Sequence, residues 1–246
     1  MGIFSLFGKK SLDPIAPPLT DMHSHLINGV DDGAETLEQS LELLTKFSEL
    51  GYSKVITTPH IMGDFYKNSA DNLLPKRDII REELSKRNIN LEFDCAAEYY
   101  LDEFFVKMLR ENKELLSFGE EKYVLFETSF MNKPIQMDEV IFELMSNGYK
   151  PVLAHPERYF YFHGNYDSYH ELANKGVLLQ ININSISGYY SAGVKKICEK
   201  LIDDEIVHFM ASDCHNLKHF GITDQARTVK YYHKAMELPL INKQVI

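Results

Sequence analysis

The chain has 246 residues, of which 44% are hydrophobic and 25% charged, and these proportions exclude a disordered or collagen-like protein. Its 26 Lys and Arg residues against 36 Asp and Glu residues give a formal net charge of −10, without a basic block that could follow a nucleic-acid backbone. Three cysteines (Cys95, Cys198 and Cys214) are too few and too odd in number for a disulfide framework, and they favour a reducing, cytoplasmic compartment.

Residues 1–18 are predicted to form a flexible leader and a proline-rich connector. The apolar run that starts at Ile3 is too short to cross a bilayer, and Lys9 and Lys10 follow it, whereas a secretory signal has its charges first. A myristoylation signal would need Ser or Thr at the position of Leu6. The less favoured alternative is that the leader makes a weak contact with a membrane surface or with a second subunit. A contact with a second subunit would make the protein a homo-oligomer. Residues 19–246 are expected to form one domain, because they contain no second linker or repeat.

Short apolar runs alternate with amphipathic segments after the connector. The runs predicted as strands are, in chain order, Leu19–His23, Lys54–Thr58, Leu91–Ala97, Tyr123–Glu127, Pro151–Ala154, Val177–Ile183 and Val207–Ser212. The segments predicted as helices are Glu35–Leu50, Asp71–Arg87, Leu101–Leu116, Gln136–Asn147, Asp167–Lys175 and Gly193–Asp203. The alternation predicts an α/β fold with a parallel sheet, either a doubly wound sheet or a closed barrel one strand short of the usual eight.

Six of the seven predicted strands carry His, Asp or Glu at or just beyond their carboxyl ends. In chain order these residues are Asp21, His23, His25, His60, Glu98, Glu127, His155, Asp213 and His215. A single histidine in such a place is more often structural than functional. The carboxyl ends of parallel barrel strands meet at one face, however, so six such strands together predict one pocket with a metal centre.

The ligand types narrow the choice of metal. His23 and His25 point to the same side of a strand because side chains alternate with a period of two. Asp21 shares this parity, so it could be a ligand or could hold the ring of His23 from behind. Imidazole and carboxylate ligands without a thiolate cluster suit Mn, Fe, Zn or Mg. The set is too large for one ion and predicts two or three, which would clamp phosphoryl oxygens and activate a bridging water for attack on phosphorus.

Missing motifs argue against three other hydrolytic mechanisms. None of the cysteines is followed six positions later by arginine, so the Cys-x5-Arg loop of thiolate phosphatases is absent. The sequence also lacks Gly-x4-Gly-Lys-Ser/Thr and Gly-x-Ser-x-Gly. A P-loop nucleotidase and a serine hydrolase are therefore not expected.

Several segments of the sequence, in their order along the chain, resemble the polymerase-and-histidinol-phosphatase (PHP) superfamily. Within it, they resemble the bacterial protein-tyrosine phosphatases of capsule and exopolysaccharide operons. The matching segments are Asp21–His25, Val30–Ala34, Thr57–His60, Ala97–Tyr100, Leu125–Glu127, Ala154–Tyr159 and Ala211–Asn216. The Asp-Asp-Gly and His-Pro-Glu-Arg-Tyr segments are specific to this branch. The resemblance covers the chain from about residue 21 to the C-terminal helix. It implies a single-domain, distorted TIM-like (β/α)7 barrel of the PHP type with three divalent ions, commonly Mn2+.

The resemblance also implies a role for each site residue. The first ion would be held by His23, His25, Glu98 and Asp213, the second by Glu98, Glu127 and His155, and the third by Asp32, His60 and His215. Asp31 is an alternative to Asp32, and both aspartates could instead cap the following helix. Arg158, His60 and His215 would be catalytic. Arg158 would clamp the phosphate, unless it forms a surface ion pair with Glu157 or Asp167. Lys218 is the candidate substitute for a second substrate-binding arginine that relatives often carry.

The implied reaction is hydrolysis of phosphotyrosine by attack of a metal-bridging hydroxide. Five aromatic residues could line a cleft for the substrate ring or could belong to the core, namely Tyr99, Tyr100, Phe130, Tyr159 and Tyr161. The implied substrate is a bacterial tyrosine kinase with a tyrosine-rich tail, or another protein of polysaccharide synthesis. The alternatives are a small-molecule phosphatase of the histidinol-phosphate type and a non-catalytic metal-binding barrel; the complete ligand set argues against the latter.

Overall fold

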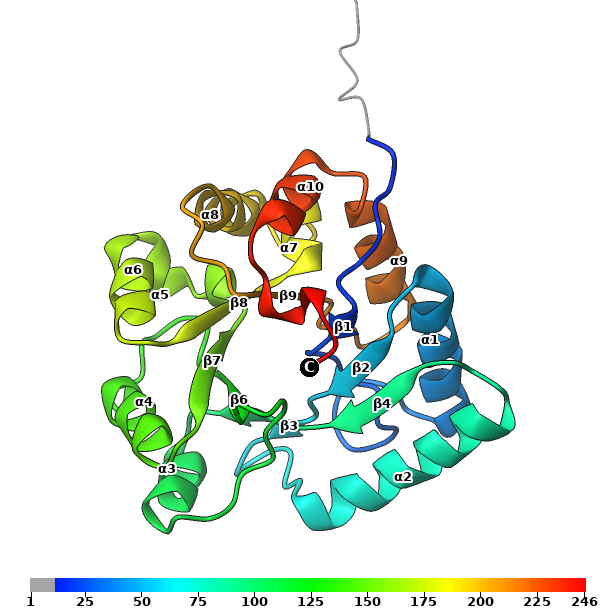
Figure 1. Cartoon of the computed structure of the whole chain (residues 1–246). Coiled ribbons are helices and arrows are strands. Elements are labelled where there is room, and N and C mark those ends of the chain that lie inside the picture. The colour runs from blue at the N-terminus through cyan, green and yellow to red at the C-terminus, as the bar shows by residue number, and fades with distance from the viewer. Residues whose placement is uncertain (1–11) are drawn as a thin grey trace, which may run out of the picture.

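The computed structural model describes residues 12–246, and the leader residues 1–11 lie outside the described part. Its parallel strands surround a central axis and its helices cover them from outside (Figure 1). The strands are β1 Thr20–Asp21, β2 Lys54–Thr57, β3 His60–Ile61, β4 Glu92–Cys95, β5 Glu98–Tyr100, β6 Tyr123–Glu127, β7 Lys150–Ala154, β8 Leu178–Asn182 and β9 Phe209–Ala211. The α-helices are α1 Leu37–Leu50, α2 Ala70–Lys86, α3 Glu103–Arg110, α4 Met137–Ser146, α5 Phe160–His163, α6 Asp167–Asn174, α7 Ile183–Ser187, α8 Ala192–Asp203, α9 Leu217–Ala226 and α10 Lys230–Glu237, with short 3-10 turns η1 Pro156–Arg158 and η2 Ile241–Lys243.

The described strands form two parallel sheets that together make a barrel with seven positions. One sheet has the order β1-β2-β4 and the other the order β3-β5-β6-β7-β8-β9. β3 continues the path of β2 after Pro59, which has no N–H to offer to the ladder. β5 likewise continues the path of β4, after Ala96 and Ala97. The chain after β1 pairs with the chain after β9, where the His25 N–H donates to the Cys214 carbonyl at 2.9 Å. The predicted α/β barrel is confirmed.

The helix boundaries follow from local capping. α1 starts where the hydroxyl of Thr36 accepts from the N–H of Gln39, and it ends at Gly51, whose φ of 107° suits glycine. α3 is shorter than predicted, because its last carbonyls are closed by a turn that leads to Asn112 at a φ of 51°. No helix in residues 12–246 is long and apolar enough to cross a membrane.

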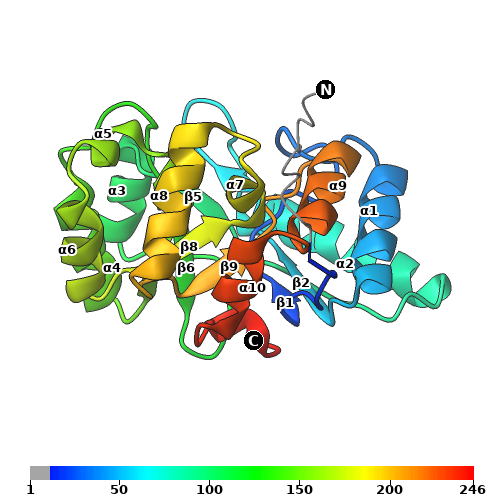
Figure 2. The same cartoon turned by 90° about the horizontal axis from the view of Figure 1, so that it is seen from above.

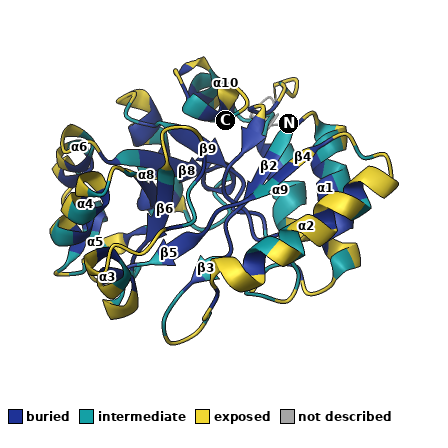
Figure 3. Cartoon of the chain, turned by 60° about the horizontal axis from the view of Figure 1, so that its bottom comes forward, coloured by how far each residue is buried: buried dark blue, intermediate teal, exposed yellow. Residues whose placement is uncertain are grey.

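The two ends of the barrel differ in what fills them. Apolar residues such as Met22, Leu125 and Phe209 pack the barrel interior. At the amino end of the strands, the buried amide of Asn242 donates to the carbonyls of Thr20 and Met210 at 2.8 and 2.9 Å. Figure 2 shows the C-terminus below the strands at this end, and Figure 3 shows buried strands inside helices with exposed outer faces. The opposite end, where the strands terminate, holds the polar site.

Candidate metal centre

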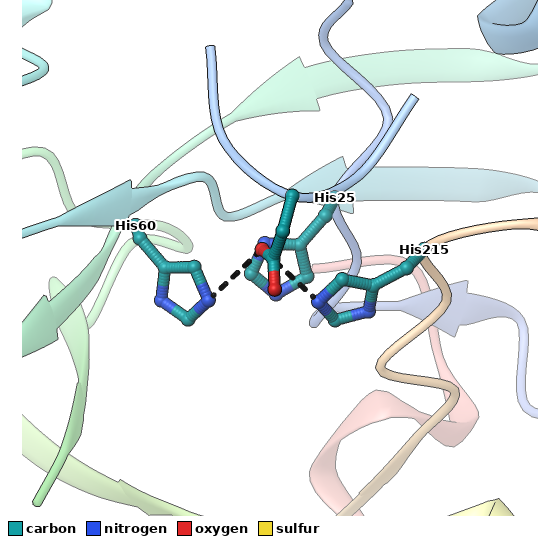
Figure 4. Close-up of side chains that lie close together, drawn as sticks. His25, His60 and His215 are labelled. Atoms are coloured by element: carbon teal, nitrogen blue, oxygen red, sulfur yellow. Dashed lines mark ion pairs between the residues drawn. The ribbon is translucent and has the colours of Figure 1, made fainter. Parts of the chain in front are cut away.

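All nine side chains that the resemblance implies as ligands meet at the carboxyl end of the barrel. Their candidate ligand atoms lie within 4.8 Å of one another in four overlapping groups. These groups are His25, Asp32, His60 and His215; His23, His155 and Asp213; His23, His25 and Glu98; and His60, Glu98 and Glu127. Figure 4 shows His25, His60 and His215 with their rings turned toward one another. The Asp32 carboxylate lies between the last two, 3.5 Å from Nε2 of each.

Glu98 lies at the centre of this cluster. Its carboxylate is 3.3 Å from His23 Nε2, 3.1 Å from His60 Nδ1 and 3.2 Å from His155 Nε2. Within the described residues, both of its buried oxygens lack a hydrogen bond of good geometry, and so does His60 Nδ1. A buried carboxylate without a donor is costly, whereas one surrounded by imidazole nitrogens is a typical ligand set for divalent ions. The donors present therefore fit a metal cluster.

The electrostatics of the protein alone point the same way. Burial by itself would lower the pKa of His23, but the carboxylates of Glu98 and Asp213 outweigh it and raise this pKa to about 9. Burial would raise the pKa of Glu98, but the charges of His23 and His60 hold it well below its usual range. The cluster thus favours positive charge among its carboxylates, which divalent ions would supply.

The structure groups two residues differently from the arrangement that the resemblance implies. Nε2 of His155 is nearer to Glu98, at 3.2 Å, than to Glu127, at 3.9 Å, and it lies in a group with His23 and Asp213. Glu127 lies instead 3.1 Å from Nδ1 of His60. His60 therefore faces Glu98 and Glu127 with one nitrogen and Asp32 with the other.

The structure distinguishes Asp31 from Asp32. Asp31 is occupied elsewhere, because its Oδ2 lies 2.8 Å from His25 Nδ1 and its Oδ1 accepts from the Gly33 N–H at 3.0 Å. Asp32 is half exposed and faces His60 and His215. The capping alternative is wrong, since Thr36 caps α1. Asp31 thus orients a ring of the cluster while Asp32 contributes its carboxylate to it.

Gly33 is required by the close approach of this loop to His25. A Cβ at this position would lie 2.1 Å from the His25 carbonyl oxygen and 2.5 Å from the His25 Cβ. We expect Gly33→Ala to lower the free energy of unfolding by about 3 kcal/mol, since backbone must move to make room, and to weaken ion binding at Asp32. Denaturant unfolding of the metal-free protein measures the first effect. Gly164→Ala, which meets no atom within 4 Å, is the control; equal stability of both variants would contradict the steric explanation.

Asp21 does not hold His23, so that part of the prediction is wrong. Its carboxylate accepts from the N–H and the hydroxyl of Ser212 at 2.8 and 2.6 Å, and burial raises its pKa to about 7. His23 Nδ1 lies instead 2.8 Å from Oε1 of Gln180 on β8. β8 is the strand without a predicted ligand, and its Gln180 and Asn182 were missed because amides are not typical ligands of these metals.

Arg158 reaches the cluster from the η1 turn after β7. Its Nη1 donates to Asp213 Oδ2 at 3.0 Å, and its guanidinium lies 4.6 Å from the ring centroid of Phe130 and 4.2 Å from that of Tyr190. The alternative of a surface ion pair with Glu157 is wrong, because Glu157 is fully buried and accepts from Asn182 and Ser185. The aromatic rings fix the plane of the guanidinium.

Lys218 lies beside the cluster rather than in it. Its Nζ is 5.2 Å from the ring centroid of Tyr189. Together with Asp32 and His215 it lines a surface cavity of about 450 Å³ between the first turns of α1 and α9. This cavity reaches Asp32 and His215 of the cluster.

The predicted aromatic cleft is smaller than expected. Tyr99 and Tyr159 are at most 1% exposed and belong to the core, where their hydroxyls accept from the N–H groups of Leu116 and Thr128. Phe130 is partly buried and contacts Arg158. Tyr100 and Tyr161 are partly buried as well.

Two residues of the cluster have a left-handed backbone conformation. The φ angle is 32° at His155 and 49° at Asp213. This conformation is unfavourable for residues other than Gly, Asn and Asp, and it is often found at functional sites.

Comparisons with known proteins agree on one family. The family model described as "Capsular polysaccharide synthesis, CpsB/CapC" matches residues 19–236. The chain is 30% identical over 200 residues to tyrosine-protein phosphatase YwqE of Bacillus subtilis (81% of this chain, 78% of the relative). It is 29% identical over 208 residues to tyrosine-protein phosphatase CpsB of Streptococcus pneumoniae (81% and 84%).

Solved structures extend the similarity to the fold. A crystal structure from work on YwqE of Bacillus subtilis and CpsB of Streptococcus pneumoniae, "unique metal-dependent tyrosine phosphatases", superposes with a TM-score of 0.76 at 29% identity, over 89% of this chain and 85% of that chain. An Escherichia coli phosphotriesterase homology protein is similar in fold alone, with a TM-score of 0.52 at 15% identity over 92% of this chain and 93% of that chain.

Proposed function

Because this chain belongs to the CpsB/CapC family of capsular polysaccharide synthesis and is a metal-dependent tyrosine-protein phosphatase, we propose that the nine clustered side chains hold three divalent ions, with Mn2+ as the first candidate. The observation that carries this proposal is the Glu98 carboxylate, which lies buried among imidazole nitrogens and has no hydrogen bond within residues 12–246. His23, His25, Glu98 and Asp213 would hold one ion, Glu98, Glu127 and His155 a second, and Asp32, His60 and His215 a third. When bound, such ions neutralise phosphoryl oxygens and lower the pKa of a water that attacks phosphorus.

The protein's own contribution to the reaction centres on Arg158. Its Nη1 donates to Asp213, and in the described residues this is the hydrogen bond that the guanidinium makes. The remaining N–H groups are therefore available to the oxygens of a phosphoryl group, which a planar guanidinium binds in a bidentate manner. The guanidinium also contacts the rings of Phe130 and Tyr190, which restrict its movement. The leaving phenol has a pKa of about 10 and needs little help from an acid.

Arg158→Lys tests the planar contact separately from the charge. We expect kcat/KM for a phosphotyrosine peptide to fall by about 10- to 100-fold, because a lysine keeps the charge but loses bidentate hydrogen bonds to an anion. Steady-state kinetics with the Mn2+-loaded protein measure this effect. Arg81→Lys on α2, where Arg81 pairs with Asp94 outside the cluster, is the control. Unchanged kinetics of the Arg158 variant, with its metal content intact, would contradict the proposed contact.

The family and the cavity beside the cluster suggest the substrate class. We infer that phosphotyrosine proteins are the substrates, with a tyrosine kinase that carries a tyrosine-rich tail as the foremost candidate. The cavity lined by Asp32, His215 and Lys218 offers room for polypeptide beside the cluster, and Lys218 would be the second cation that the substrate meets. Purified, metal-loaded protein should therefore hydrolyse a phosphotyrosine peptide with a much higher kcat/KM than histidinol phosphate. A marked preference for histidinol phosphate would contradict this assignment.

A further inference from the structure

Two amide side chains of β8 connect His23 with Asp213. Gln180 and Asn182 are fully buried and, being two residues apart on a strand, point to the same side. Gln180 Oε1 lies 2.8 Å from His23 Nδ1, and Gln180 Nε2 donates to Asn182 Oδ1 at 2.9 Å. Asn182 Nδ2 then donates to Asp213 Oδ2 at 2.6 Å. The result is a continuous chain of hydrogen bonds between two side chains of the cluster.

The chemistry of the end groups fixes the direction of every link. An ionised carboxylate only accepts hydrogen bonds, so Asn182 must present its NH2 group to Asp213 and its oxygen to Gln180. Gln180 must then present its NH2 group to Asn182 and its oxygen to His23. His23 must consequently carry a hydrogen on Nδ1, so in the neutral ring that binds a metal the lone pair lies on Nε2. This Nε2 faces Glu98 and Asp213 at 3.3 and 3.5 Å.

The other end of the chain orients Asp213. Its Oδ2 accepts from Asn182 at 2.6 Å and from Arg158 at 3.0 Å, while Oδ1 lies 3.5 Å from Nε2 of both His23 and His25. Asn182 is itself held in place, because its backbone N–H donates to the buried Glu157 at 2.9 Å. One oxygen of Asp213 is thus occupied by the protein, and the other faces the imidazoles.

We propose that Gln180 and Asn182 are positioning residues that prepare the first ion site, because they present His23 Nε2 and Asp213 Oδ1 to the same ion. The inference rests on the metal centre of the proposed function. It assigns a role to β8, which contributes no side chain to the four ligand groups found among the described residues. Partners that orient ligating histidines typically change metal affinity by about 10- to 100-fold.

The test is titration of the metal-free, full-length protein with Mn2+ alone, followed by calorimetry and by the Mn2+ electron paramagnetic resonance signal. Gln180→Met keeps the approximate size but removes both links, so one of the ions should bind about 10- to 100-fold more weakly. Gln180→Glu keeps an acceptor for His23 and should recover part of that loss. If Gln180 mattered through packing alone, the Gln180→Glu variant, with its extra buried carboxylate, would bind Mn2+ no more tightly than the Gln180→Met variant.

A second residue and a control complete the design. Asn182→Leu removes the same chain at its other end, and the double variant with Gln180→Met should lose less affinity than the sum of the two single losses, because the links act as a unit. Gln225→Met on the exposed side of α9 should bind Mn2+ like the wild type. Wild-type Mn2+ affinity in the Gln180→Met and Asn182→Leu variants would overturn this inference. Failure of the wild-type protein itself to bind Mn2+ would instead overturn the proposed metal centre.

Discussion

Glu98→Gln is expected to lower kcat on a phosphotyrosine peptide by at least about 10³-fold. Glu98 is the side chain that contacts three imidazoles at 3.1 to 3.3 Å, and glutamine keeps its size while removing the negative charge. Without this shared carboxylate, at least one ion should be lost, and the ions are expected to contribute several kcal/mol of transition-state stabilisation. Turnover and bound metal per chain should therefore fall together.

The measurement is kcat with metal content by elemental analysis on the same preparation. Glu237→Gln, at the exposed end of α10, is the matched control and should keep both quantities. Circular dichroism of the Glu98 variant should still show a folded barrel, because the apolar core between strands and helices is unchanged. Retention of activity with a full metal complement would show that Glu98 is not a ligand.

Removal of the ions by a chelator is the second prediction with a large effect. We expect activity to disappear, and the melting temperature to fall by about 10 °C relative to protein with Mn2+ in roughly 1,000-fold excess over its dissociation constant, since ligands of the folded state stabilise it by about 4 kcal/mol under that condition. The metal-free protein should still be folded below its own, lower melting temperature.

Readdition of single metals completes this experiment. Mn2+ should restore both activity and melting temperature, and parallel additions of Zn2+, Fe2+ and Mg2+ rank the alternatives that the ligand types allow. Full activity in protein with fewer than two ions per chain would rule out the proposed mechanism. A melting temperature that does not respond to Mn2+ would show that the ions bind elsewhere or not at all.

The longer strands were predictable because each lies in a short apolar run that a polar residue ends or follows. β6, for example, has the predicted bounds Tyr123–Glu127. The short strands β3 and β5 were not predicted, because they are two and three residues long and depend on pairing with each other. α9 and α10 were not given bounds either. The start of α9 depends on the Asn216 side chain, which accepts from the His219 N–H.

The ligand-type residues were predictable for a related reason, since the carboxyl ends of parallel strands must meet. The sequence alone could not distinguish the roles of neighbouring residues of the same type. Asp31 and Asp32 are adjacent carboxylates, and only the position of the His25 ring separates them. Asp21 has the strand parity of His23 but turns to Ser212. Nothing in the sequence marks the amides of Gln180 and Asn182 on β8 as part of the site.

One residue of the site, His155, carries a backbone cost that a glycine would not. Its left-handed φ angle of 32° would suit glycine better, at a saving on the order of 1 kcal/mol. Folding and chemistry therefore make opposite demands on this position. A library of this chain screened for heat resistance alone, without selection for turnover, should drift toward His155→Gly and yield stable but inactive barrels. Thermal engineering of this enzyme should hold His155 fixed.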